Sequence, residues 1–375
     1  MLAACSSSGS GSGSTSGGAS TSGSGSSASG SGYTIGATIP LTGSAASFGV
    51  EAQGGMNIAL NEINAAGGIN GHKLSISYED DQLVPATAAT DMQDLAGKGI
   101  KVVLTGGSSV VNGELPVTAQ HNMLLVNIAA QDDTFLTNQN YFTFIPTNNM
   151  ELGQLAKLVY SQRHLTKVAV IHSNDAYGAS ASAAFISGYK ALGGTVTDEE
   201  EHAEGTTNYS TYLIKIRASN PQGLVILSNT GEIGHIIAQA RQLGLMVPLY
   251  GADSALSPGD VQTAGAAMNG VEGVSVNFSP STSAAGKAFA ATFQQQNKVP
   301  ANSYAAICYT AVKQLAQAIQ STGGDDPAKI SAYLHAVKSV PTLLGTAAAV
   351  PGKPVITYPI YEWLYTGGAV TALKS

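Results

Sequence analysis

The sequence predicts an α/β fold made of two doubly wound lobes, and three observations lead to this fold class. Short apolar runs of strand length alternate with segments of helical periodicity along most of the 375 residues, a pattern typical of β-α-β units with parallel strands. The pattern begins again after Asn148 and Asn149. The chain beyond its Ser- and Gly-rich start is also longer than one hydrophobic core usually supports, so two lobes are expected.

The first half of the chain supplies one complete α/β layer. Strands are expected where apolar residues alternate or run together, and helices where they recur every three to four positions. The expected elements are a strand at 33–41, a helix at 56–63 that ends at Gly67 and Gly68, a strand at 74–79, a helix at 86–96, and strands at 102–105, 124–128 and 141–146. Such a series suits a parallel sheet with helices on both faces.

The second half repeats this order and then adds a C-terminal part. The repeat comprises a helix at 152–159, a strand at 168–172, a helix at 185–192, an acidic strand end at 198–201, a helix at 213–216, a strand at 224–227, a helix at 233–243 and a strand at 249–253. The C-terminal part comprises a strand at 271–277, helices at 304–319 and 330–337, and a strand at 358–365. Because this part has no third domain to form, we expect it to complete both lobes, with the chain crossing between them more than once.

Two strands of the first layer end in turns of small residues that suit ligand binding. Residues 106–109 (Gly-Gly-Ser-Ser) follow one strand, and residues 129–132 (Ala-Ala-Gln-Asp) follow another. Parallel strands bring both turns to the carboxyl edge of the sheet, where backbone N–H groups and helix N-termini bind ligands. The same residues also suit an ordinary strand-to-helix turn, and position alone leaves both interpretations open.

Composition narrows the classes of function. The net charge is −7 with 11% charged residues, and Lys and Arg do not cluster, which argues against nucleic acid or an anionic membrane surface as a partner. No apolar stretch after the first 32 residues is long enough to span a bilayer. No histidine pair has helical ligand spacing, two cysteines cannot form a zinc cage, and phosphate-loop and Gly-x-Ser-x-Gly motifs are missing. We therefore expect neither an enzyme nor a bound metal or cofactor.

The N-terminal residues predict a lipid-anchored tether. Leu-Ala-Ala-Cys at residues 2–5 looks like the lipobox at which bacterial lipoprotein signal peptides are cut before the cysteine is acylated, although four residues can also match by chance. Residues 1–5 would then be the remnant of a signal peptide, with Cys5 as the acylated residue. Residues 6–32 contain only Ser, Gly, Ala and Thr, which predicts a flexible coil spanning roughly 30 Å. Cys308 lies in an apolar helical stripe and is expected to be a buried free thiol.

Four segments resemble the substrate-binding proteins of branched-chain amino acid ABC transporters, the leucine-binding-protein-like members of the type I periplasmic binding protein family. The segments are 39–43, 54–71, 172–178 and 205–216, of which 61–71 is the most specific. The resemblance implies two Rossmann-like lobes joined by three crossovers. It places residues 33–147 and 279–346 in the first lobe, and residues 148–278 and 347–375 in the second.

The resemblance also implies ligand-binding residues in the first lobe. Ser109 matches the serine that holds the α-carboxylate of an amino acid, and Phe48 matches an aromatic residue that contacts the ligand side chain. Ala130 and Asp132 fall on the second turn, where family members supply backbone groups and usually a threonine. Because Asp132 replaces a neutral hydroxyl, it either turns away or marks a ligand with additional positive or hydrogen-bonding groups.

Four further ligand-binding residues are implied in the second lobe. Tyr177 matches a tyrosine that contacts the ligand, Asp253 matches the acidic residue that meets the α-ammonium, and Asn229 or Thr230 lies where another contact is expected. A zwitterion needs donors at one end and an acceptor at the other, which suits groups on opposing lobes. Apart from the resemblance, Asp253 would suit a helix cap, and Tyr177 and Phe48 would suit half-buried aromatic positions.

These features lead to one expected function and one alternative. The expected function is that of a monomeric, extracytoplasmic, lipid-anchored solute-binding protein on the extracellular or periplasmic side of the cell membrane. It would capture an amino acid, branched-chain or a related small polar ligand, by lobe closure and deliver it to the permease subunits of an ABC transporter. Because the same fold also serves receptors, a sensing module for amides, urea or amino acids is the alternative.

Overall fold

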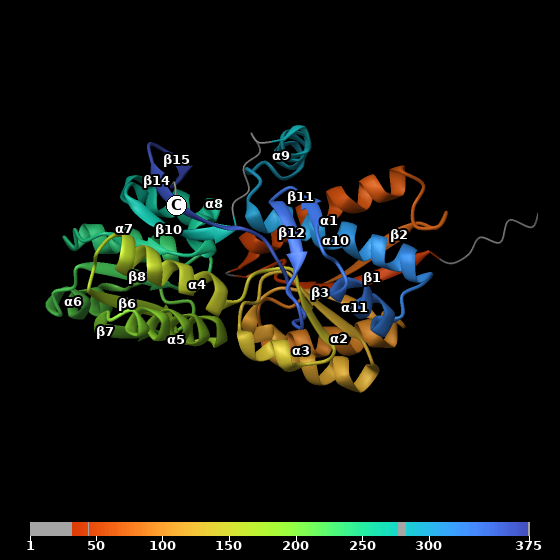
Figure 1. The fold of residues 1–375 in the computed structure, drawn as a ribbon, viewed down its shortest axis with the longest axis horizontal. Coiled ribbons are helices and arrows are strands. Elements are labelled where there is room, and N and C mark those ends of the chain that lie inside the picture. The colour runs from red at the N-terminus through yellow and green to blue at the C-terminus, as the bar shows by residue number, and fades with distance from the viewer. Residues whose placement is uncertain (1–31, 44, 277–282, 374–375) are drawn as a thin grey trace, which may run out of the picture. The chain divides into compact units, whose positions relative to one another are not determined.

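Two α/β lobes make up the compact unit Gly32–Ser375 (Figure 1). The structure is a computed structural model that describes residues 32–43, 45–276 and 283–373. The expected acylated Cys5, residues 6–31 of the expected tether and the expected lobe boundary at 278 and 279 lie outside these residues. Within the described ranges, no helix has both the length and the apolar character needed to cross a membrane.

The first lobe is built on a five-stranded parallel sheet with the order β2-β1-β3-β4-β5. Its strands are β1 (Tyr33–Ile39), β2 (Leu74–Asp80), β3 (Val102–Thr105), β4 (Leu124–Asn127) and β5 (Tyr141–Thr143). The helices α1 (Ala46–Ala65), α9 (Ala284–Asn297), α10 (Ser303–Thr322) and α11 (Pro327–His335) cover one face, and α2 (Pro85–Gly97) and α3 (Ser108–His121) cover the other. Successive strand residues point to opposite faces, so Leu104 packs with the α1 side and Val103 with the α2 side.

The second lobe contains a seven-stranded sheet with the order β15-β14-β10-β9-β8-β6-β7. Its strands are β6 (Lys167–Ser173), β7 (Thr195–His202), β8 (Gly223–Leu227), β9 (Leu249–Gly251), β10 (Val271–Val276), β14 (Ile360–Thr366) and β15 (Ala369–Ala372). Strands β6 to β10 pair in parallel, whereas β14 and β15 pair antiparallel. The helices α4 (Asn148–Lys157), which continues as a π-helix (Leu158–Gln162), and α5 (Ala176–Ala191) cover one face; α6 (Ser210–Ala218), α7 (Ile233–Gln242) and α8 (Pro258–Ala264) cover the other.

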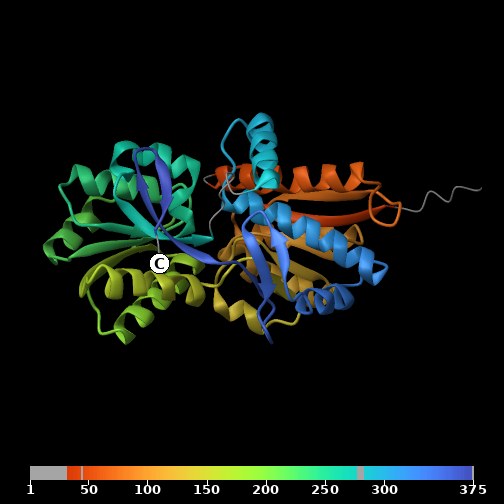
Figure 2. The same cartoon turned by 45° about the horizontal axis from the view of Figure 1, so that its top comes forward.

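The chain passes between the lobes three times, after β5, after β10 and before β14. Strand β5 ends at Thr143, three residues earlier than expected, although Phe144 and Ile145 are still buried in the first core. The last passage also differs from the expectation. The sequence places it at residue 347, but Ala347, Ile356 and Tyr358 are buried in the first core. Ala347 and Ile356 belong to a small three-stranded sheet, β11 (Val340–Thr342), β12 (Gly345–Ala349) and β13 (Ile356–Thr357), and Tyr358 follows its last strand. The dark-blue chain therefore crosses to the second lobe only after β13 (Figure 2).

Helices α1 and α10 approach each other closely in the first lobe. A Cβ atom added to Gly55 of α1 would lie 2.1 Å from the carbonyl oxygen of Ala305 in α10, so only glycine fits at this crossing. This approach fixes Phe48 on α1 beside Tyr304 on α10, with ring centroids 5.5 Å apart in an edge-to-face arrangement. The packing of the core thus sets the position of two aromatic rings at the end of the sheet.

Candidate ligand-binding site

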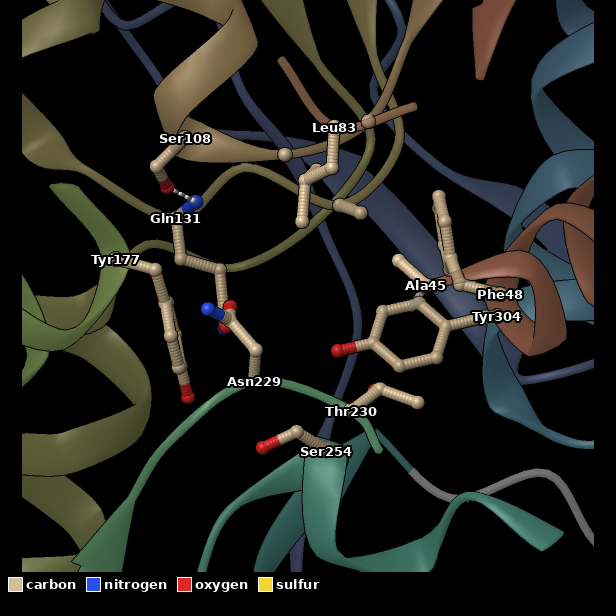
Figure 3. A pocket seen from close by; sticks show the side chains of 13 residues that line it. Ala45, Phe48, Leu83, Ser108, Gln131, Tyr177, Asn229, Thr230, Ser254 and Tyr304 are labelled. Atoms are coloured by element: carbon tan, nitrogen blue, oxygen red, sulfur yellow. Dashed lines mark hydrogen bonds between the residues drawn. The ribbon is translucent and has the colours of Figure 1, made fainter. Parts of the chain in front are cut away.

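A pocket of about 520 Å³, including space open to solvent, lies at the carboxyl ends of the strands and is lined by both lobes (Figure 3). The first lobe contributes Ala45, Phe48, Leu83, Gly106, Gly107, Ser108, Ala129, Gln131 and Tyr304, and the second contributes Tyr177, Asn229, Thr230 and Ser254. None of these lining side chains carries a formal charge, but seven of them carry a hydroxyl or amide group.

The turn after β3 presents backbone donors to the pocket. Gly107 adopts φ 132, a value that favours glycine, and α3 begins at the next residue without a side-chain cap. The first N–H groups of a helix have no partner within it, and the helix dipole favours a negative charge there. The Ser108 hydroxyl accepts a hydrogen bond from the Gln131 N–H at 3.4 Å, which leaves its own O–H free to donate. This side of the pocket suits a carboxylate.

Aromatic rings form a second part of the wall. The Tyr304 hydroxyl points toward the centre of the pocket, and the Phe48 ring lies beside it (Figure 3). Tyr177 faces them from the start of α5 in the second lobe. All three side chains are largely buried, with 7%, 7% and 8% exposure for Phe48, Tyr304 and Tyr177. This part of the wall suits an apolar or aromatic group that has a polar end.

Two buried carboxyl groups lie behind the part of the pocket wall that Gln131 and Ser254 form. The Asp253 N–H donates to Glu151 Oε1 at 3.2 Å, and Gln131 Nε2 donates to Glu151 Oε2. Glu151 and Asp253 are only 1% and 5% exposed. Burial raises the pKa of both carboxyls, and the charge of Glu151 raises the pKa of Asp253 further. This side of the pocket suits a positive charge.

A second cavity of about 470 Å³ adjoins the pocket on the side of β7 and β8. The two cavities share Ala45, Leu83, Asn229 and Thr230, and the second adds Glu204, Gly205, Thr206, Thr207, Gly231, Glu232 and His235. Glu232 accepts hydrogen bonds from the N–H groups of Gly205 at 2.8 Å and Asn229 at 3.2 Å, so it holds the two loops together. Burial raises the pKa of Glu232 to about 7.

Across the described part of the chain, no group of His, Cys, Asp and Glu side chains is arranged to hold a metal ion.

The eight residues that the resemblance implies do not all line the pocket. Phe48, Tyr177, Asn229 and Thr230 do, whereas Ser109, Ala130, Asp132 and Asp253 do not. In each of these four cases a sequence neighbour lines the pocket instead. Ser108 does so in place of Ser109, Ala129 and Gln131 in place of Ala130, Gln131 in place of Asp132, and Ser254 in place of Asp253. Successive residues of a turn or helix point in different directions, so neighbouring positions differ in whether their side chains enter the pocket.

Three of the four residues have other contacts, made by the Ser109 side chain and by the backbones of Ala130 and Asp253. The Ser109 hydroxyl donates to Asp175 Oδ2 at 3.3 Å, a bond between the lobes in which Asp175 also caps α5. The Ala130 N–H donates to Asn127 Oδ1 at 2.6 Å, and its carbonyl accepts from Asn127 Nδ2 at 2.7 Å. Asp253 faces Glu151. Sequence reasoning missed Ser108, Gln131, Tyr304 and Glu151, although Ser108 and Gln131 lie in the two turns it selected.

Asp132 has a capping role at the start of a short 3-10 helix (Asp133–Thr137). Its Oδ1 accepts hydrogen bonds from the Thr134 N–H at 2.9 Å and the Thr134 hydroxyl at 2.8 Å. We expect Asp132→Ala to lower the free energy of unfolding by about 1 kcal/mol, because the cap is lost, and to leave solute affinity unchanged. Chemical denaturation and calorimetry of the same sample measure both. A large loss of affinity at unchanged stability would place Asp132 in contact with the solute.

Comparison with known proteins finds similarity over most of the chain. A family model described as periplasmic binding protein matches residues 32–364. The Leu/Ile/Val-binding protein homolog 3 of Brucella melitensis is 27% identical over 319 residues, which cover 84% of this chain and 86% of that protein.

Two solved structures show similarity of fold. The branched-chain amino acid transporter substrate-binding protein LivJ of Streptococcus pneumoniae, in complex with isoleucine, has a TM-score of 0.82 at 22% identity and covers 92% of this chain and 100% of its own. An ABC transporter solute-binding protein of R. palustris, in complex with 4-hydroxybenzoate, has a TM-score of 0.83 at 19% identity. The similarity covers 92% of this chain and 96% of that protein. The predicted fold of two α/β lobes is confirmed.

Proposed function

The chain belongs to the periplasmic binding protein family, and from this premise we propose that it captures an amino acid, branched-chain or a related small polar solute, between its lobes. The observation that carries the proposal is a pocket lined by both lobes, with backbone donors at the start of α3 and buried carboxyls behind Gln131 and Ser254. The names of its relatives, a Leu/Ile/Val-binding protein homolog and an isoleucine complex, support an amino acid as the solute.

Each end of a zwitterionic amino acid has a matching region in the pocket. The α-carboxylate suits the N-terminus of α3 and the Ser108 hydroxyl. The α-ammonium suits the side of Ser254, in front of Glu151 and Asp253. Because these groups belong to different lobes, the solute gains all its contacts only when the lobes are closed, so it shifts the open-closed equilibrium toward closure.

The proposed setting is the outer side of the cell membrane. Acylation at Cys5 and the tether that follows would hold the monomeric protein there, where lobe closure would present the bound solute to the permease subunits of an ABC transporter. No catalytic step is part of this proposal. The motif at residues 2–5 and the composition of residues 6–32 support it.

A second solute class is an aromatic carboxylic acid. One structural relative was determined with 4-hydroxybenzoate, and the rings of Phe48, Tyr304 and Tyr177 around the pocket favour a flat apolar group. A benzoate would place its carboxylate at the α3 N-terminus and its ring between these side chains. It would leave the side of the buried carboxyls without a positive partner.

Calorimetry against a panel of solutes tests the proposal. The panel contains the common L-amino acids, short amides, urea, benzoate and 4-hydroxybenzoate. We expect at least one L-amino acid to bind with a Kd of about 1 μM or tighter, a binding free energy of about −8 kcal/mol, without being consumed. If no amino acid binds, the proposed class of solute is wrong. Binding of benzoates alone would assign the pocket to aromatic acids.

Ser108 and Ser109 form a matched pair of variants for the carboxylate end. We expect Ser108→Ala to weaken binding of the tightest amino acid about tenfold, because a hydrogen bond to a charged group is lost. We expect Ser109→Ala to change affinity less than about threefold, since its hydroxyl contacts Asp175 rather than the pocket. Isothermal calorimetry measures both. The reverse order would show that Ser109 turns into the pocket when the solute binds, as the family resemblance implies.

A further inference from the structure

The pocket and the second cavity meet at a boundary made by four residues that line both of them. Ala45 and Leu83 come from the first lobe, and Asn229 and Thr230 come from the second. Leu83 projects toward Asn229 and Thr230 from the other side of the pocket (Figure 3). Leucine has the largest side chain of the four, so Leu83 has the greatest influence on which groups can pass from the pocket into the second cavity.

A tight turn after β2 holds Leu83 at this boundary. Gln82 and Leu83 adopt φ 52 and φ 61, left-handed values that are uncommon for residues other than glycine. The Asp81 carboxylate accepts a hydrogen bond from the Leu83 N–H at 2.7 Å, and the Asp81 carbonyl accepts one from the Val84 N–H at 2.8 Å. A Cβ atom added to Gly107 would lie 2.5 Å from Leu83 Cδ1. The side chain is therefore packed against the start of α3, in a fixed position.

The second cavity differs from the pocket in charge. None of the side chains that line the pocket carries a formal charge, whereas Glu204 and Glu232 line the second cavity, together with His235. Glu204 is exposed, and Glu232 is buried, with its carboxylate bound by two backbone N–H groups. Within the described ranges, neither carboxylate forms an ion pair, and no Lys or Arg lines either cavity. The second cavity therefore suits a group with a positive charge.

Both charged ends of an amino acid in the pocket would lie near the boundary. At the carboxylate end, Leu83 packs against Gly107 at the start of α3. At the ammonium end, the Ser254 hydroxyl donates to the carbonyl of Ser228, the residue before Asn229, at 3.2 Å. The α-carbon joins these two ends, so it also lies near the boundary. A long side chain can then extend past Leu83 into the second cavity.

We propose that the second cavity receives the end of the solute's side chain, so that the protein selects L-amino acids with a long unbranched side chain that ends in an ammonium or guanidinium group. This inference rests on the proposed function and names the side chain of the solute. The methylene groups pack against Ala45 and Leu83, and the cationic end donates charge-assisted hydrogen bonds to Glu204 and Glu232. A short or branched apolar side chain leaves both carboxylates without a cation.

The test compares cationic amino acids with neutral counterparts of the same length. L-Norleucine has the carbon chain of L-lysine without the terminal ammonium, and L-citrulline replaces the guanidinium of L-arginine by a neutral urea group. All four are titrated by calorimetry into the full chain. We expect the tighter of the two cationic amino acids to bind about tenfold tighter than its neutral counterpart, because hydrogen bonds to charged groups are lost. This ratio of affinities should fall as the salt concentration rises.

Variants at the boundary and in the second cavity locate the source of this ratio. Leu83→Phe fills the boundary, so we expect the ratio to fall close to one. Glu204→Gln should lower it about threefold, since Glu204 is exposed, and Glu232→Gln should lower it further, since Glu232 is buried. Glu201→Gln is the control, because Glu201 is exposed on β7 and lines neither cavity. Thermal unfolding checks the fold of each variant, and Ala45→Leu replaces Leu83→Phe if that variant does not fold.

The outcomes separate this inference from the proposed function. If neutral amino acids bind as tightly as lysine and arginine, or tighter, selection of a cationic side chain is wrong and the proposed function stands. An unchanged ratio in a folded Leu83→Phe protein would show that the side chain does not pass Leu83. An equal loss in Glu201→Gln and Glu204→Gln would assign the ratio to the overall charge of the protein instead of the second cavity. If no amino acid binds, both proposals are wrong.

Discussion

Gly106→Leu is expected to weaken solute binding by more than about a hundredfold, a loss of about 3 kcal/mol. Gly106 follows β3 at the base of the pocket, and a Cβ atom there would lie 2.7 Å from the Phe48 ring and 3.3 Å from the Ala129 Cβ. A leucine can be accommodated only if Phe48 moves or the new side chain enters the pocket. Either change removes the space in which the solute would lie.

The affinity of the Gly106 variants is measured by calorimetry with the tightest solute of the panel, and their folding by thermal unfolding. Gly97→Leu is the control, because Gly97 is exposed at the end of α2 and no atom lies within 4 Å of an added Cβ. Gly106→Ala should give an intermediate loss, since it adds only the crowded Cβ. Full binding by a folded Gly106→Leu protein would place the solute outside this pocket.

Ionisation of Glu114 is expected to make folding of the first lobe strongly pH-dependent. Glu114 lies on α3, is fully buried, and accepts hydrogen bonds from the hydroxyls of Thr38 at 2.5 Å and Thr105 at 2.6 Å. Burial raises its pKa from 4.5 to about 8, although the two hydroxyls oppose the shift. The folded state therefore holds a proton that the unfolded state releases at lower pH.

The sign of the effect follows from these two pKa values. A raised carboxyl pKa contributes stability that is complete below pH about 4.5 and is lost as the pH rises through about 8. The full difference corresponds to about 5 kcal/mol, and relaxation or water entry would reduce it. We expect Glu114→Gln, which does not ionise, to remove this part of the pH dependence and to be relatively more stable at alkaline pH.

Urea unfolding between about pH 5 and about pH 9 tests the Glu114 prediction, because the free energy of unfolding then reports proton linkage. Glu62→Gln is the control, since Glu62 is an exposed residue that pairs with Lys313 at 3.1 Å. Other buried carboxyls, such as Glu51, titrate in both proteins, so the difference between the two pH profiles is the relevant quantity. Parallel profiles for Glu114→Gln and the unmodified protein would show that Glu114 is not the titrating group.

Much of the fold was predictable because it depends on local patterns. The apolar runs at 102–105 and 124–128 form the buried parallel strands β3 and β4, and the turns after them face the pocket. The crossing points were less predictable. Residues 347–358 have no pattern that distinguishes the two cores, and only the burial of Ala347 and Tyr358 places them with the first.

The sequence by itself indicated two α/β lobes and the strand ends that form the pocket, and its resemblance to a known family indicated four lining positions, Phe48, Tyr177, Asn229 and Thr230. Only the tertiary structure decided that Ser108 rather than Ser109 lines the pocket, because side-chain direction at a helix start depends on how the helix packs. It also placed Glu151 beside Asp253. Periodicity carries information about neighbouring residues, whereas the environment of a buried charge is set by segments that meet only when the chain is folded.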